Sequence, residues 1–163
     1  MKSVGGAYLP LVRPRAADPT VNDAISTILA LVGQVESRTI SDLIIAASGS
    51  WRETIVGLVL AAGAGPRAYV PAMLTSLAKP RGLAIVPTFA VVTVSVRSSQ
   101  PEGVAKDLAC LDRSAFSGEL GWAIDKFLFH TGIASTDVAR FSPNDGAVFE
   151  HHLQVYEDIG RAE

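Results

Sequence analysis

The sequence predicts an all-α, single-domain fold built from stacked helical hairpins, and three observations lead to this prediction. Apolar residues recur along most of the 163-residue chain at the three- and four-residue spacing of one helix face. Gly and Pro clusters divide the chain into helix-sized segments. The long segments begin near residues 50, 82 and 117, a period of 32 to 35 residues. Helical pairs that recur at this spacing are typical of an α-solenoid.

Composition excludes a disordered chain and a membrane-spanning chain. Hydrophobic residues make up 48% of the sequence, charged residues 18%, and the mean hydropathy is +0.31, which is too apolar for disorder. The longest uncharged runs, 82–96 and 54–66, are 15 and 13 residues long. A spanning helix needs roughly 20 apolar residues, so we expect no membrane segment. A lone cysteine, Cys110, and the absence of a secretory signal favour a cytoplasmic protein.

The N-terminal third predicts an arm and two helices. Residues 1–17 contain Gly, Pro and scattered Arg, and we expect an extended N-terminal arm. Asp18-Pro19 then supplies an N-cap followed by proline at the first helical position. One apolar stripe follows, formed by Val21, Ile25, Ile28, Leu29 and Val32. A second, short helix is expected from about Ser41, with Gly49 as its C-terminal stop.

A capping box starts the next helical pair. In Ser50-Trp51-Arg52-Glu53, the Ser hydroxyl and the Glu carboxylate are spaced to pair with free backbone N–H groups. The helix that begins here is expected to end at Gly63, Gly65 and Pro66. A shorter helix carries Val70, Met73, Leu74 and Leu77 and stops before Pro80.

Residues 82–96 fit two structures. Val92 to Val96 alternate as in a strand, and their β-branched side chains favour strands. However, Ile85, Phe89, Val92 and Val96 lie on one helical face. Pro87 would remove a hydrogen bond from a central strand, whereas a helix can absorb it as a kink near its first turns. We therefore predict a helix, with an edge strand as the alternative.

The C-terminal part predicts three more helices. One opens at Pro101, one is capped by Ser117 and ends at Gly132, and the apolar stripe of the latter is Leu120, Ile124, Phe127 and Leu128. Residues 133–146 are expected to form a loop, followed by a terminal helix with Phe149, Leu153 and Tyr156. The helical repeats thus cover 18–132, and 133–163 complete the same domain.

Over about residues 20–131 the chain resembles the HEAT-like repeat superfamily. The residues that carry this resemblance are the Ser50–Glu53 opening, the Gly65-Pro66 turn, Pro87 and Leu111-Asp112. Trp51 to Leu60, together with Leu111-Asp112, is also similar to small HEAT-like bacterial immunity proteins that neutralise toxins. The resemblance implies a non-catalytic cytoplasmic protein-binding module, and in its most specific form an immunity protein that masks its cognate toxin.

Charge is divided unevenly along the chain. Residues 1–99 carry a balance of +4 and residues 100–163 a balance of −6, which gives the net charge of −2. Four basic residues fall at expected helix ends or turns, where a solenoid would align them along one edge: Arg67, Lys79, Arg81 and Arg97. We predict that this basic strip, or alternatively the acidic C-terminal region, binds another protein, rather than nucleic acid or a membrane. The alternative is that Lys79 and Arg97 simply complement helix C-termini.

One segment suggests an enzyme instead. Leu60 to Arg67 is similar to the phosphate loop of sugar-nucleotide nucleotidyltransferases, and Lys79 lies near where that family keeps a lysine. That loop should follow a buried strand near the start of an α/β domain, whereas here it follows a capped helix in mid-chain. The alternative prediction is therefore a nucleotidyltransferase-like enzyme that uses 60–67.

The other candidate groups indicate no catalytic residue, metal or cofactor. His151 and His152 are adjacent to Glu150, but neighbouring helical residues do not share a face, so we expect a solvated polar patch. His130 is interpreted as a cap at a helix C-terminus. Cys110 is expected in the core, as are the two tryptophans, Trp51 and Trp122.

Overall fold

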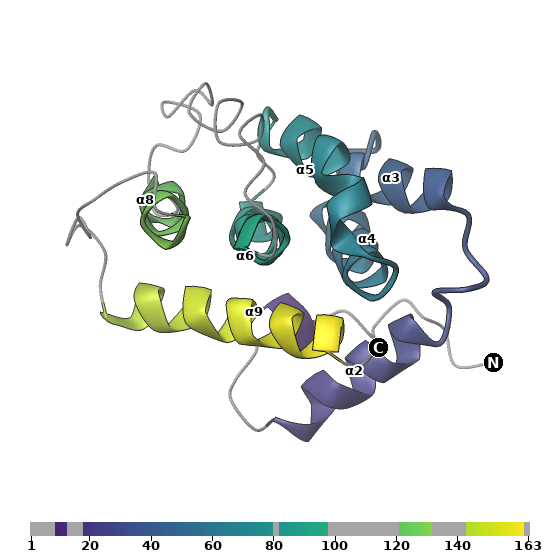
Figure 1. Ribbon diagram of the computed structural model, residues 1–163, viewed down its shortest axis with the longest axis horizontal. Helices are drawn as coiled ribbons and strands as arrows, with labels where there is room; N and C mark the ends of the chain where they lie inside the picture. The colour runs from purple at the N-terminus through teal and green to yellow at the C-terminus, as the bar shows by residue number, and fades with distance from the viewer. Residues whose placement is uncertain (1–8, 13–17, 80–81, 98–120, 132–142, 162–163) are drawn as a thin grey trace.

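The structure is a computed structural model, and it describes residues 9–12, 18–79, 82–97, 121–131 and 143–161. These residues form helices and turns, and no strand occurs among them (Figure 1). The α-helices are α1 Leu9–Val12, α2 Pro19–Leu29, α3 Ser37–Ile45, α4 Trp51–Gly63, α5 Val70–Leu77, α6 Ile85–Arg97, α8 Gly121–His130 and α9 Pro143–Arg161, and the short 3-10 helices are η2 Pro66–Tyr69 and η3 Gly82–Ala84. The prediction of an all-α fold is confirmed for this part of the chain. Within it, no helix has both the length and the apolar run that crossing a bilayer requires.

Helix α6 lies at the centre of the molecule. In Figure 1 it is seen end-on between α8 and α4, with α9 running beneath it. Every residue from Ile85 to Thr93 is buried. The hydroxyls of Thr88 and Thr93 donate to the carbonyls of Ala84 and Phe89 at 2.7 and 2.8 Å, so these polar groups are satisfied within the helix itself. The helix prediction for 82–96 is confirmed, because a continuously apolar segment is buried here on all sides.

Helix α9 connects the two ends of the fold. It contacts α4, α6 and α8 and lies across them rather than beside one of them (Figure 1). Phe149, Leu153 and Tyr156 are all buried, as the sequence predicted for a terminal helix. The helix begins at Pro143, inside the range expected to be a loop. Because α9 contacts helices from both halves of the chain, the packing shows an all-α fold without showing a repeat.

The N-terminal helices differ in detail from the predictions. Asp18 caps α2 as expected, its carboxylate accepting from the Thr20 backbone N–H at 2.9 Å. The predicted extended arm contains α1, in which Leu11 is 2% exposed. Helix α3 begins at Ser37, before the predicted Ser41, and ends at Ile45 with Ala46 as its C-cap, before the predicted stop at Gly49. Ala46 adopts a left-handed conformation, with φ 45°, and donates to the Asp42 carbonyl.

The start of α4 uses a modified capping box. Ser50 is the N-cap, but its hydroxyl makes no capping hydrogen bond, which corrects the prediction. Instead, the Ser48 hydroxyl donates to Glu53 Oε2 at 2.9 Å and accepts from the Ser50 backbone N–H at 3.2 Å. Glu53 therefore reaches the N-cap through Ser48, because that hydroxyl stands between the two groups.

Several predictions lie outside the described residues. These are the helix opening at Pro101, the Ser117 cap, the Gly132 stop and the placement of Cys110 in the core. Helix α8 is described from Gly121, and its Phe127 and Leu128 are buried as predicted.

Candidate binding site

The structure places the four predicted basic residues in different surroundings. Arg67 is exposed on η2, Lys79 is exposed just beyond α5, and Arg97 is the last residue of α6. Arg81 lies outside the described residues. Arg97 lines a surface pocket that is also lined by Pro66, the residue before Arg67. Lys79 is not among the residues that line it.

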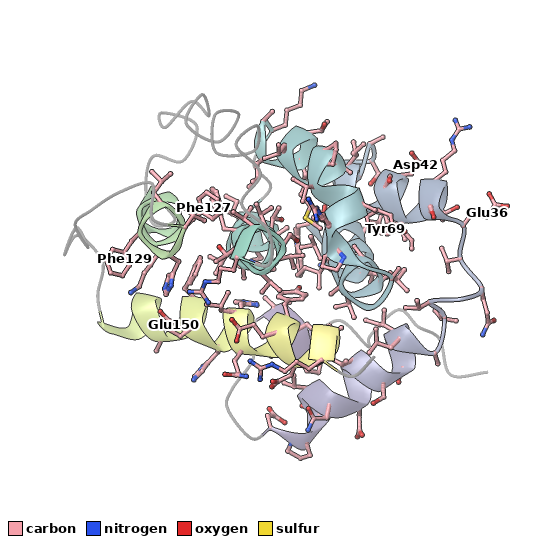
Figure 2. All side chains as sticks on the ribbon, in the orientation of Figure 1. Glu36, Asp42, Tyr69, Phe127, Phe129 and Glu150 are labelled. Atoms are coloured by element: carbon pink, nitrogen blue, oxygen red, sulfur yellow. The ribbon has the colours of Figure 1, made fainter. Side chains whose placement is uncertain are left out.

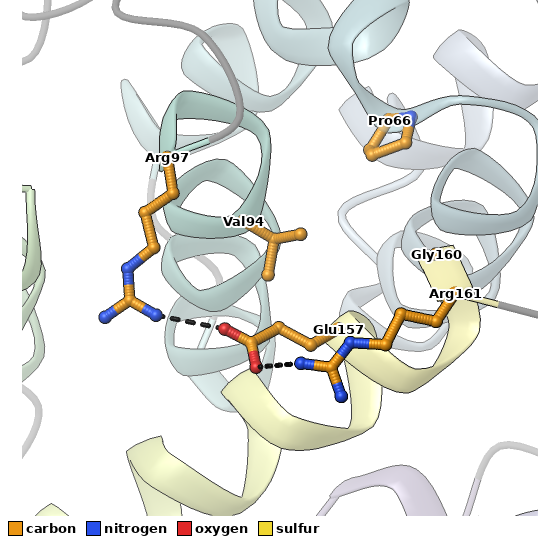
Figure 3. A pocket seen from close by; sticks show the side chains of 6 residues that line it. All are labelled: Pro66, Val94, Arg97, Glu157, Gly160 and Arg161. Carbon is orange, nitrogen blue, oxygen red and sulfur yellow. Dashed lines mark hydrogen bonds and ion pairs between the residues drawn. The ribbon is translucent and has the colours of Figure 1, made fainter.

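This pocket, which we call the C-terminal pocket, lies where α6 and α9 end and η2 begins (Figure 3). Its volume is about 420 Å³. Among the described residues, six line it: Pro66, Val94, Arg97, Glu157, Gly160 and Arg161. Residues three or four apart share a helix face, so α6 and α9 each present one face to the pocket.

One carboxylate stands between two arginines in this pocket. Arg97 Nη1 donates to Glu157 Oε1 at 3.0 Å, and Arg161 Nη2 donates to Glu157 Oε2 at 3.4 Å (Figure 3). A second contact of Arg161, to Asp158 Oδ1, is also 3.4 Å long. The Arg161 side chain is 68% exposed, compared with 39% for Arg97 and 25% for Glu157. Arg97 is thus held closely, whereas Arg161 is held by two long contacts within its own helix.

His130 fixes Arg97 from the other side. Arg97 Nη2 lies 2.7 Å from His130 Nδ1, and His130 Nε2 lies 2.7 Å from Glu150 Oε1. A guanidinium can only donate, so Nδ1 accepts and the ring proton is on Nε2, pointing to Glu150. The His130 ring also stacks on Phe149, with centroids 5.4 Å apart.

The result is a continuous polar network across three helices. It runs from Glu150 through His130 and Arg97 to Glu157 and Arg161, and Figure 2 shows Glu150 on α9 close to α8. The sequence indicated only a capping role for His130, because its partners lie 20 and 33 residues away in the chain.

The electrostatics of the pocket are mildly positive. Its side chains carry two positive charges and one negative charge, from Arg97, Arg161 and Glu157. Both arginines are also in the last turn of a helix, where a cation stabilises the unpaired carbonyl groups. The helix-end interpretation therefore accounts for their positions, while their shared pocket also makes them accessible to an anionic ligand.

The Gly-rich segment 60–67 is a helix end and a turn. Leu60 to Gly63 belong to α4, and the Ala64 N–H donates to the Leu60 carbonyl at 2.9 Å. A Cβ on Gly63 would lie 2.3 Å from Leu29 Cδ2, so its missing side chain lets α2 approach α4. Gly65 has φ 92°, which permits the turn into η2. Helix packing and turn geometry account for both glycines.

The prediction that His152 belongs to a solvated polar patch is wrong, because His152 is buried, with 1% exposure. A ring N–H donates to the Val12 carbonyl, and Nε2 has no hydrogen-bond partner within the described structure. The pKa of His152 is lowered to about 3, mainly by burial and to a smaller extent by the neighbouring His151, while the hydrogen bond to Val12 opposes this shift. Burial also raises the pKa of Tyr156, whose ring stacks on His152 at 6.5 Å. Among the described residues, no three metal-ligating side chains gather.

Comparison of the chain with models of known protein families, with curated proteins and with solved structures found no match. Function is therefore inferred from the sequence and from the geometry of the described residues.

Proposed function

We propose that this protein is a non-catalytic module of HEAT-like helical hairpins that binds another protein around the C-terminal pocket. The observation that carries the proposal is a concave surface with two arginines from different helices, both more than one-third exposed. Arginines and shaped pockets concentrate binding energy at protein interfaces. Pro66 and Val94 add an apolar wall against which a partner side chain can pack.

A toxin-neutralising immunity protein is the most specific form of this proposal. It rests on the resemblance of Trp51–Leu60 to small HEAT-like bacterial immunity proteins. The pocket agrees with masking by tight binding, because such a role needs a shaped surface and no reacting group.

The packing of 60–67 supports a binding module over a nucleotidyltransferase. A phosphate loop needs backbone N–H groups that are free to point at phosphate oxygens. Here the segment begins as the last turn of α4, and the Ala64 N–H is already used by the Leu60 carbonyl. Arg67 then lies on η2 and is exposed.

Site-specific photocrosslinking tests the proposal. A photoreactive benzophenone amino acid replaces Arg67, the residue after Pro66 of the pocket, and in a matched variant it replaces Arg38 on α3. Both positions are exposed arginines, and α3 lies on the far side of α4 and α5 from α6 (Figure 1). In lysate of the cells that naturally produce the protein, position 67 should crosslink one protein that position 38 does not.

Three results would overturn the assignment. Equal crosslinking from both positions, or none from position 67, would show that the pocket does not face a partner. Thermal stabilisation by a nucleoside triphosphate with Mg²⁺ that disappears in Arg67→Ala would favour the enzyme, because a ligand at 100 times its Kd stabilises by about 2.7 kcal/mol.

A further inference from the structure

The two arginines of the C-terminal pocket are held differently, and this difference suggests how a partner is recognised. Arg97 has short contacts on both sides, to Glu157 at 3.0 Å and to His130 at 2.7 Å. Within the described residues, the polar contacts of Arg161 are two of 3.4 Å, to Glu157 and Asp158, which lie four and three residues away on the same helix. Exposed pairs of this kind contribute little to stability. Arg161 can therefore change partner without loss to the fold.

We infer, resting on the proposed function, that the pocket binds an acidic side chain of the partner protein. Arg161 leaves Glu157 and Asp158 and forms a bidentate ion pair with the partner's carboxylate, while Arg97 stays in place. Glu157 remains paired with Arg97, so no buried charge is left without a partner.

The chemistry of the pocket favours a carboxylate on an apolar stem. A guanidinium presents parallel N–H donors that match the two oxygens of a carboxylate. The described side chains that line the pocket sum to +1, so a single negative charge offsets their excess. Pro66 and Val94 offer apolar surface to the methylene groups of a glutamate. A cationic side chain would instead meet two arginines.

Gly160 leaves room for this group. A Cβ built at Gly160 meets nothing within 4 Å, although Gly160 lines the pocket between the two residues that carry its charges on α9. The Cβ of Gly160→Leu therefore meets open space, the rest of the side chain is expected to fill the pocket, and leucine favours the helix more than glycine does. This variant blocks the pocket and keeps the fold.

The test is a titration of the protein with a peptide, in which NMR monitors the signals of the arginine side-chain Nε–H groups. The probe is acetyl-Leu-Glu-amide, and its control is acetyl-Leu-Gln-amide, which has the same shape without the charge. We expect the acidic peptide to shift the Arg161 signal, with a Kd on the order of millimolar. The amide peptide should bind at least about tenfold more weakly, and so should the acidic peptide to Arg161→Gln, in which the Arg97 signal is followed instead, because a charge-assisted pair is lost. Gly160→Leu should abolish the shift, and Arg38→Gln should leave it unchanged.

Three outcomes of the peptide titrations would overturn the inference. These are no shift with the acidic peptide, equal shifts with the two peptides, and persistence of the shift in Gly160→Leu. The same titration is made with sodium acetate. If acetate binds as tightly as the acidic peptide, the pocket is a site for small carboxylates and not for a partner's side chain, and the inference fails.

Crosslinking separates this inference from the proposed function. If position 67 still crosslinks its partner with full yield in an Arg161→Gln background, the inference fails while the proposed function stands. If position 67 crosslinks no specific protein even when Arg161 is kept, the proposed function fails as well.

Discussion

Acidification should destabilise this protein through His152 before most of its carboxylates titrate. His152 lies on α9 and is buried, with a hydrogen bond to the Val12 carbonyl of α1. Burial is the main cause that lowers its pKa from 6.5 to about 3. In the unfolded chain the imidazole is exposed and takes up a proton near its ordinary pKa. Between pH 6.5 and 3 the unfolded state therefore binds more protons than the native state, and the free energy of unfolding falls as pH falls.

The size of the effect follows from this pKa difference. Each pH unit below 6.5 removes about 1.4 kcal/mol from the free energy of unfolding, until the native pKa is reached. At pH 5 the loss attributable to His152 is about 2 kcal/mol. That is a large share of the stability of a small domain, which is about 5–15 kcal/mol in total.

Urea denaturation of the wild type and His152→Leu at pH 7 and pH 5 measures this contribution. The variant loses the hydrogen bond to Val12 and should be less stable at pH 7. Its decrease in stability between pH 7 and pH 5 should nevertheless be about 2 kcal/mol smaller than that of the wild type. His151→Leu, at the half-buried neighbouring position, is the matched control; it removes only the smallest of the effects on the pKa of His152 and should keep most of the wild-type pH dependence. Parallel pH profiles for the wild type and His152→Leu would refute the assignment of a buried neutral imidazole.

Three further predictions concern packing and the polar network. Gly57→Ala places a Cβ 2.8 Å from the Ile44 backbone N, so it should lower the free energy of unfolding in urea by about 1–2 kcal/mol. The Cβ of Gly160→Ala meets open space, so this variant should raise the free energy of unfolding by up to about 1 kcal/mol. Equal effects of the two would contradict the close approach of α3 to α4. Arg97→Gln removes contacts to α8 and α9 and should lower the unfolding free energy by about 1 kcal/mol, with the same urea assay as the measurement. Pro87→Ala, in the first turn of α6, should leave the far-UV circular dichroism spectrum unchanged, and a loss of helical signal would show that proline is needed to start the helix.

The helices were predictable where local signals specify them. Asp18-Pro19 fixed the start of α2, because capping and the proline preference at the first helical turn act within a few residues. Residues 82–96 were predictable because a proline and a helical apolar face outweighed the β-branched alternation. The stop of α3 was missed because Ala46, a residue that seldom adopts positive φ, makes the left-handed turn.

The candidate site was only partly predictable. Arg97 was singled out by its place at a helix end, but Glu157 and Arg161 join it only through the crossing of α9 over α6. The burial of His152 and the network partners of His130 were missed for the same reason, although His130 does lie in the last turn of α8 as expected. Periodicity on a helix shows which residues share a face, and it does not show which other helix covers that face.

Charge at the C-terminal pocket is proposed to guide this protein to a protein partner. The most direct test is the association rate with the crosslinked partner, measured against ionic strength for the wild type, Arg161→Gln and Arg38→Gln. We expect the wild-type rate to fall as salt rises from about 0.05 to 0.5 M, because screening shortens the Debye length from about 14 to 4 Å. Arg161→Gln should associate more slowly and show a weaker salt dependence, while Arg38→Gln should match the wild type. A rate that is independent of salt and unchanged in Arg161→Gln would contradict the proposal.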